Sequence, residues 1–335
     1  MKLPYIIFLL IPLFTSASGT WEREPQKSGE RIFTNPPEHQ HKINLTELEI
    51  FGPLIMRVAH DRGIALYDYA TFNGYFFPPD NYSSPVSIGD GKGGGPREFV
   101  NPTDTAFDNE GNIWIADPQQ GRISVWRRDG DLLRTINPAP RQPHRIALTA
   151  NRCIIFGSGG DHTLFKIADV DGNKIDTIEN IGSDMLGWIF TYEGYLTSDR
   201  RGFVYTGLWY GIIRKYTEDG ELVYSRGTID PVGPAKPEHR TIEGTRVVMA
   251  PRDAPMATLS SYIANEKLYL LSPDNNDNNI RMIDVYELST GDYRYSIPLP
   301  ERTRFIGITG NTLISFEGRD EEPFYVISVY RFNNN

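Results

Sequence analysis

The chain has 335 residues, of which 39% are hydrophobic, and a formal net charge of -9 at pH 7. This length can bury a large core, either in two domains or in one closed architecture. The negative charge argues against nucleic acid and anionic lipid surfaces as partners, because both require basic patches. The single cysteine, Cys153, excludes an intrachain disulfide, so packing must supply the stability, and Cys153 is expected to be a small buried residue.

Residues 1–18 have the layout of a secretory signal peptide. Lys2 is followed by the apolar run 3–14 and then by small residues, and we expect cleavage near Ala17 or Ser18. The mature protein would then be secreted or periplasmic. The apolar run is shorter than the roughly 20 residues that a membrane-spanning helix needs, so no transmembrane segment is expected. Residues 19–42, which are rich in proline and charge, are expected to form a flexible leader.

Short strands and tight turns recur from residue 43 to residue 332. A small polar turn followed by a second strand occurs six times, at 61–67, 109–116, 150–156, 199–206, 265–271 and 310–316. A later turn, usually Asp-Gly, occurs five times, at 80–81, 129–130, 171–172, 219–220 and 290–291. Asp, Asn and Gly suit the positive φ angles of two-residue hairpins. The final unit therefore lacks its fourth strand, and the run 43–50 is expected to supply it.

The clearest unit spans residues 89–136. A glycine-rich loop is followed in order by Glu98-Phe99, Asn101-Pro102, Asp108-x-x-Gly-Asn, Ile115-Ala116-Asp117 and Arg122-Ile123-x-Val. This order resembles the NHL repeat, a blade unit of β-propellers, and the chain resembles a TolB-like six-bladed propeller of the bacterial secreted type. The resemblance implies a four-stranded antiparallel sheet packed between two similar sheets.

We therefore predict an all-β fold, a six-bladed β-propeller over residues 43–332 that is closed by an N-terminal strand joining the last blade. The blades are expected at 54–92, 99–137, 143–182, 187–228, 255–298 and 303–332, the last completed by 43–51. Between the fourth and fifth blades lies the proline-rich insertion 229–254. It is expected on the face that bears the loops after each second strand, where binding residues often lie.

Several polar and aromatic residues are candidates for a ligand site near the mouth of the channel: Asp104, Asp117, His144, His162 and Trp209. No Gly-x-Ser-x-Gly elbow occurs, and the glycines at 91–95 lack the Gly-Lys-Ser/Thr of a phosphate-binding loop. The sequence therefore predicts a non-catalytic scaffold that binds a protein, a peptide or a small molecule. We expect it to act as a monomer without a cofactor.

A second hypothesis is a metal-dependent lyase or lactonase. The runs 101–108 and 143–146 resemble blade starts of the peptidyl-hydroxyglycine lyase domain, a zinc-dependent six-bladed propeller, although the paired cysteines of that family are missing. The resemblance implies that His144 binds zinc, with Asp104 also facing the channel. Calcium is the other candidate metal, because Asp274 and Asp277 lie in a loop rich in the oxygen donors that calcium prefers.

Overall fold

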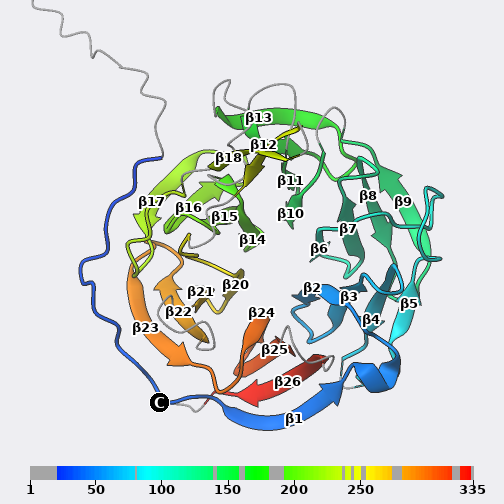
Figure 1. Ribbon diagram of the computed structural model, residues 1–335, viewed down its shortest axis with the longest axis horizontal. Coiled ribbons are helices and arrows are strands. Elements are labelled where there is room, and N and C mark those ends of the chain that lie inside the picture. Colours follow the sequence, from blue (N-terminus) through cyan, green and yellow to red (C-terminus); the bar gives the residue numbers. More distant parts are fainter. Residues whose placement is uncertain are drawn as a thin grey trace, which may run out of the picture.

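Six four-stranded antiparallel sheets form a ring around an axis, and each sheet places its first strand nearest that axis (Figure 1). The computed structural model describes residues 21–332, except 80, 139–141, 158–162, 181–191, 236–237, 243–244, 250–253, 274–280 and 319–324. The predicted all-β fold, a six-bladed propeller, is confirmed. No helix in the described part of the chain is long and apolar enough to cross a membrane.

The first three blades follow one another in the chain. Blade 1 contains β2 (Pro53–Val58), β3 (Ile64–Asp68), β4 (Asn73–Phe77) and β5 (Val86–Ile88). Blade 2 contains β6 (Asp104–Phe107), β7 (Ile113–Asp117), β8 (Arg122–Trp126) and β9 (Leu132–Ile136). Blade 3 contains β10 (Arg145–Leu148), β11 (Cys153–Phe156), β12 (Thr163–Ala168) and β13 (Lys174–Asn180).

The remaining blades complete the ring. Blade 4 contains β14 (Gly194–Ser198), β15 (Gly202–Gly207), β16 (Ile212–Thr217) and β17 (Leu222–Gly227). Blade 5 contains β20 (Ser260–Ala264), β21 (Lys267–Pro273), β22 (Arg281–Glu287) and β23 (Tyr293–Pro298). Blade 6 contains β24 (Thr303–Thr309), β25 (Thr312–Gly318), β26 (Tyr325–Arg331) and, from the N-terminal part of the chain, β1 (Glu38–Asn44).

Ring closure uses a strand from near the N-terminus, as predicted, but its position differs from the prediction. The strand is β1, at 38–44 rather than 43–50, and it pairs antiparallel with β26, with Ile43 opposite Ile327. Residues Thr46–Leu48 instead form a 3-10 turn. Leu45 and Ile50 on either side are fully buried in the cluster that joins blades 5, 6 and 1. The apolar spacing thus reflects a connection packed into the core rather than an edge strand.

Residues 21–36, which precede β1, cross the outer edges of blades 4 and 5 (Figure 1). Glu24 bridges Arg226 of β17, and Phe33 bridges Ser296 of β23. This part of the expected flexible leader therefore has defined contacts with the ring. The physical reason is that an outer strand presents unpaired backbone groups, which a passing segment can satisfy.

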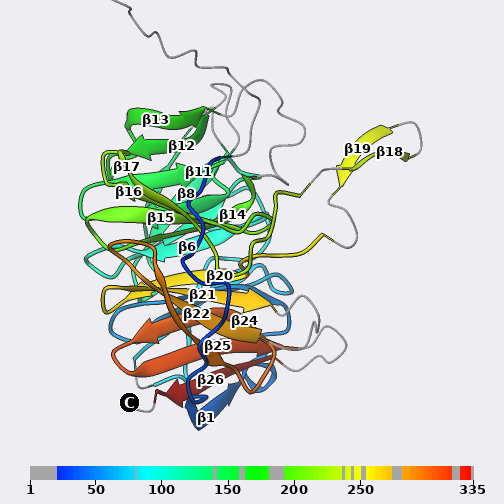
Figure 2. The same ribbon diagram turned by 90° about the vertical axis from the view of Figure 1, so that its left-hand side faces the viewer.

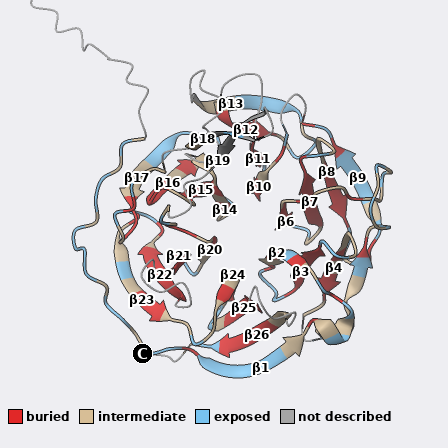
Figure 3. Ribbon diagram, in the orientation of Figure 1, coloured by how far each residue is buried: buried red, intermediate tan, exposed pale blue. Residues whose placement is uncertain are grey.

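The core lies between adjacent blades, because each sheet is covered on both faces. Buried residues concentrate on the inner strands, while the outermost strands carry most of the exposed positions (Figure 3). One cluster packs Trp114 and Ile123 of blade 2 against Ile146 and Ile155 of blade 3. Cys153 belongs to the same cluster and is 1% exposed, which confirms the prediction of a small buried residue.

The insertion between blades 4 and 5 contains a hairpin of β18 (Glu238–Ile242) and β19 (Thr245–Met249), which projects from one face of the ring (Figure 2). Its two ends are tied to the loop between β15 and β16. Gly211 N–H donates to the Val232 carbonyl at 3.0 Å, and Ala257 N–H donates to the Leu208 carbonyl at 2.7 Å. The insertion therefore lies on the face of the loops after the second strands, as expected.

Candidate functional site

A cavity of about 550 Å³ lies at the axial end of the ring where first strands turn into second strands. Described residues of five blades contribute to its lining, and none of those that line it belongs to blade 6. All first strands run in the same direction along the axis. The cavity therefore lies at the face opposite the insertion, which leads into the start of β20. Because the ends of rigid strands position the lining, the site is largely preformed.

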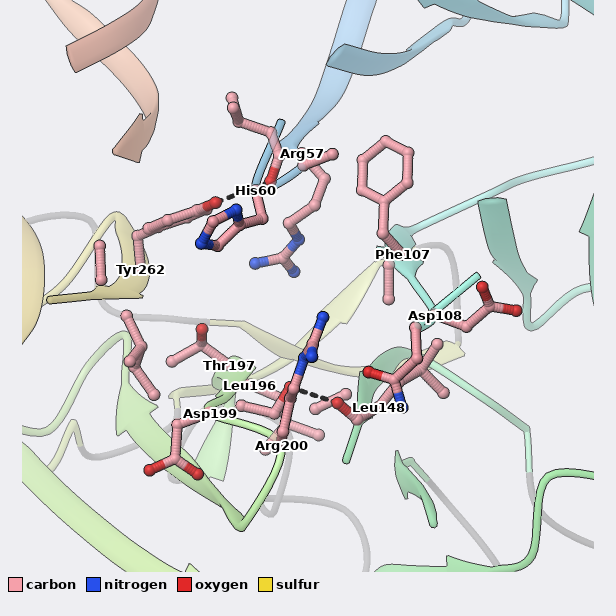
Figure 4. Close-up of a pocket in the computed structure, with 18 of the residues that line it drawn as sticks. Arg57, His60, Phe107, Asp108, Leu148, Leu196, Thr197, Asp199, Arg200 and Tyr262 are labelled. Carbon is pink, nitrogen blue, oxygen red and sulfur yellow. Dashed lines mark hydrogen bonds between the residues drawn. The ribbon is translucent and has the colours of Figure 1, made fainter. Parts of the chain in front are cut away.

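Arg57, near the end of β2, places its guanidinium group in the cavity (Figure 4). Its Nε donates to the Thr105 carbonyl at 2.9 Å, and its Nη2 donates to Asp104 Oδ1 at 3.0 Å. Only 18% of this side chain is exposed. The two contacts hold the guanidinium in one orientation and leave Nη1 without a hydrogen-bond partner among the described residues.

Arg200 and His60 come from two of the turns that rim the cavity. Figure 4 shows the side chains of both residues directed toward the guanidinium of Arg57. Both residues are exposed. Neither side chain forms a hydrogen bond or an ion pair with any described residue. Three nitrogen-bearing side chains thus converge on one volume.

The two labelled carboxylates at the rim point away from that volume (Figure 4). Asp108 accepts hydrogen bonds from Asn112 N–H at 2.8 Å and from Trp114 Nε1 at 3.0 Å. Asp199 accepts one from Gly202 N–H at 2.9 Å and lies 3.4 Å from Lys215 Nζ. These two carboxylates therefore shape their turns, and Glu266, the other acidic residue of the lining, pairs with Arg201 at 3.5 Å.

The cavity also has apolar walls. Phe107, Leu148, Leu196 and Tyr262 lie around the guanidinium groups (Figure 4). The Tyr262 hydroxyl donates to the Val58 carbonyl at 2.8 Å, and burial raises the pKa of Tyr262 to about 12. This hydroxyl therefore stays protonated, and its contact joins blade 5 to blade 1.

Of the residues proposed from the sequence, those that the structure describes do not line this cavity. Asp104 is nearest, because it contacts Arg57. It is 4% exposed and also accepts hydrogen bonds from Thr105 N–H and Ile146 N–H, each at 2.9 Å. Asp117 is 1% exposed and accepts from Val100 N–H at 2.8 Å. The structure thus places both carboxylates in contacts that join neighbouring backbone segments.

His144 immediately precedes β10 and Trp209 lies in the loop between β15 and β16, so both are near the insertion face. Burial, with the nearby charge of Arg145, lowers the pKa of His144 to about 4. The Thr103 hydroxyl donates to the His144 carbonyl at 2.8 Å. Trp209 is half-buried. The structure does not bring these two residues together with the cavity.

His162, Asp274 and Asp277 lie outside the described residues. Within the described ranges, no group of three or more His, Cys, Asp or Glu side chains is arranged to hold a metal ion.

The sequence reasoning missed Arg57, His60 and Arg200. A signal existed for Arg200, because Asp199-Arg200-Arg201-Gly202 was recognised as one of the six recurring turns. The pattern locates the turn, but only the ring geometry shows that Arg200 points to the axis. Arg62, at the corresponding turn of blade 1, does not line the cavity.

No protein-family model and no curated protein sequence matches the chain. Solved structures do resemble it. Virginiamycin B lyase from Staphylococcus aureus is 13% identical, with a TM-score of 0.55 over 88% of this chain and 99% of that one. An exported protein of Bacteroides fragilis is 12% identical, with a TM-score of 0.54 over 90% and 100%. U3-55K is 11% identical, with a TM-score of 0.54 over 88% and 100%. At such identities the likeness shows the propeller fold alone.

Proposed function

We propose that this chain is an extracytoplasmic, non-catalytic binding scaffold whose ligand site is the axial cavity. The observation that carries the proposal is a cavity of about 550 Å³ lined from five blades. Small-molecule sites typically measure about 300–1,000 Å³ and combine apolar walls with a few placed polar groups. The cavity has both features.

The distribution of hydrogen bonds favours binding over catalysis at this site. A general acid or base must reach the proton that it transfers. Asp108 and Asp199 instead accept hydrogen bonds from their own turns and point away from the cavity (Figure 4). The groups that do face the cavity, Arg57 and Arg200, are suited to holding a ligand, because a guanidinium stays protonated and offers several donors.

The extracytoplasmic location rests on the signal-peptide pattern of residues 1–18. Membership of the NHL or TolB-like group rests on the repeat order in 89–136. In support, Asp117 holds the backbone that leads into blade 2 by accepting from Val100 and Asn101 N–H groups. N-terminal sequencing of the exported protein tests the location. A mature N-terminus near residue 18 or 19 supports it, and retention of Met1 contradicts it.

The alternative function, a metal-dependent lyase or lactonase, draws support from His144. Its pKa of about 4 keeps the imidazole neutral at pH 7, the form that binds zinc. Elemental analysis of the purified protein separates the two proposals. Stoichiometric zinc or calcium that is lost in His144→Ala would support the enzyme, whereas a metal-free protein that still binds ligands would support the scaffold.

A cavity-filling variant tests the scaffold directly. Thr197 lies on β14 with its side chain at the cavity (Figure 4), so Thr197→Phe should occlude part of the volume. Compounds that raise the melting temperature of the wild-type protein in a small-molecule screen should lose their effect on this variant. Leu133→Ala, an exposed change on β9, is the control. Equal shifts in Thr197→Phe and wild type would contradict a ligand site in the cavity.

A further inference from the structure

We infer that the axial cavity binds an organic anion, a carboxylate or phosphate with an apolar body, through Arg200 and Arg57. This inference rests on the proposed binding function and names its ligand class. Arginine suits the role because its planar guanidinium donates two parallel hydrogen bonds to a carboxylate or phosphate.

Arg200 provides the uncompensated positive charge. It lines the cavity, and its side chain has no ion-pair partner among the described residues, whereas the neighbouring Arg201 pairs with Glu266 at 3.5 Å. The backbone beneath Arg200 is fixed, because its carbonyl accepts from Ala150 N–H of the adjacent blade at 2.9 Å. The Arg200 guanidinium therefore extends into the preformed cavity from a turn whose backbone is held by a hydrogen bond.

Arg200 occupies a left-handed position in its turn. Its φ is 70°, in the region that disfavours residues with a side chain. Arg62 and Glu266, in the corresponding turns of blades 1 and 5, have φ angles of 73° and 57°. The conformation is therefore a feature of the recurring turn, and the position of Arg200 in the ring is what places its side chain at the cavity.

Arg57 supplies a second, preoriented group. Its contacts with Thr105 and Asp104 balance its charge and fix its plane, while the guanidinium lies in the cavity (Figure 4) and Nη1 has no hydrogen-bond partner among the described residues. His60 offers a ring N–H from the third side. An anionic head group between Arg57 and Arg200 would therefore meet donors from blades 1 and 4 without competition from the carboxylates of Asp108 and Asp199.

The apolar lining of the cavity indicates that the anion is an organic one. Phe107, Leu148, Leu196 and Tyr262 surround the basic groups (Figure 4), and a bare inorganic ion would leave most of the 550 Å³ without contacts. An apolar body in this space removes apolar surface of both the ligand and the cavity wall from water. A ligand with a charged head and a flat or branched apolar body fits both parts of the site.

Calorimetric titration of the exported protein with three matched probes tests the inference. Benzoate and phenyl phosphate carry the two anionic heads, and benzamide is the neutral counterpart of benzoate. We expect at least one anion to bind about tenfold more tightly than benzamide, since a charge-assisted contact is stronger than a neutral one. Arg200→Gln should abolish this preference and Arg200→Lys should retain part of it.

Arg62→Gln is the matched control, because Arg62 has a φ of 73° in the corresponding turn of blade 1 but does not line the cavity. It should bind all three probes as the wild type does. Equal affinity for benzamide and both anions, no binding of either anion at millimolar concentration, or an unchanged preference in Arg200→Gln would each overturn the anion assignment. If Thr197→Phe still abolishes binding of benzamide, the cavity remains the ligand site and only the assigned ligand class fails.

Discussion

Replacing Asp104 by alanine should lower the stability of the whole ring, because this carboxylate joins three blades. From β6 of blade 2 it accepts from Arg57 of blade 1 at 3.0 Å, and from Ile146 N–H of blade 3 and its neighbour Thr105 N–H at 2.9 Å each. Asp104 is 4% exposed, so water cannot replace it at these donors. Asp104→Ala would leave the largely buried guanidinium of Arg57 and two backbone N–H groups without their acceptor.

The structure allows the size of the effect to be worked out. Removing one partner of a buried ion pair typically costs about 3–5 kcal/mol. Unfolding entropy near the melting temperature is about 2.1 cal/mol/K per residue, which gives roughly 0.6 kcal/mol/K over residues 43–332. The melting temperature of Asp104→Ala should therefore fall by about 5–8 °C.

Differential scanning calorimetry of the wild type and variants measures this shift. Asp171→Ala is the control, because Asp171 pairs with Arg134 at 2.6 Å but is 66% exposed, and surface pairs contribute about 0–1 kcal/mol. If Asp104→Ala melts within about 2 °C of the wild type, or no lower than Asp171→Ala, then the buried contacts do not carry the stability assigned to them.

Three further predictions concern other buried groups. Arg31→Ala should release residues 21–36 and speed their proteolysis, because Arg31 donates hydrogen bonds to Asp230 and to Asp284, which is 1% exposed. An unchanged rate of cleavage would contradict the role of Arg31 in holding this segment. His144 is protonated near pH 6.5 in the unfolded chain and near pH 4 in the folded chain. The free energy of unfolding should therefore fall by at most about 3 kcal/mol as the pH drops through this window. In urea titrations, His144→Gln should flatten this pH dependence. Cys153 should resist thiol reagents in the native protein at pH 8, since burial raises the pKa of its thiol to about 12; rapid labelling without unfolding would argue against its burial.

The blade number followed from the sequence because it depends on local chemistry. Turns such as Asp129-Gly130 and Asp171-Gly172 require positive φ, which Gly130 (91°) and Gly172 (88°) adopt in the structure. Strand-forming runs between such turns can be counted without any knowledge of the ring. The need for a strand from the N-terminal part also followed, because an unpaired last blade would expose backbone groups.

The position of that strand required the tertiary structure. Leu45 and Ile50 have the spacing of an edge strand, yet both are fully buried where the last and first blades meet. They share this cluster with Phe316 and Ile327, residues far away in the chain, so no local pattern distinguishes the two arrangements. The same limit explains why 38–44, with its exposed charged residues, was not recognised as β1.

The candidate site shows even more clearly what the local sequence determines and what depends on the tertiary structure. The sequence located its turns and identified acidic and histidine residues as chemically capable, but the ring engages Asp104 and Asp117 in hydrogen bonds to backbone N–H groups. It directs Arg57 and Arg200 to the axis instead. Local sequence determined which segments become strands and turns, because backbone preferences act over a few residues. Closure of six blades around one axis decided which side chains meet, because that depends on residues brought together from across the whole chain.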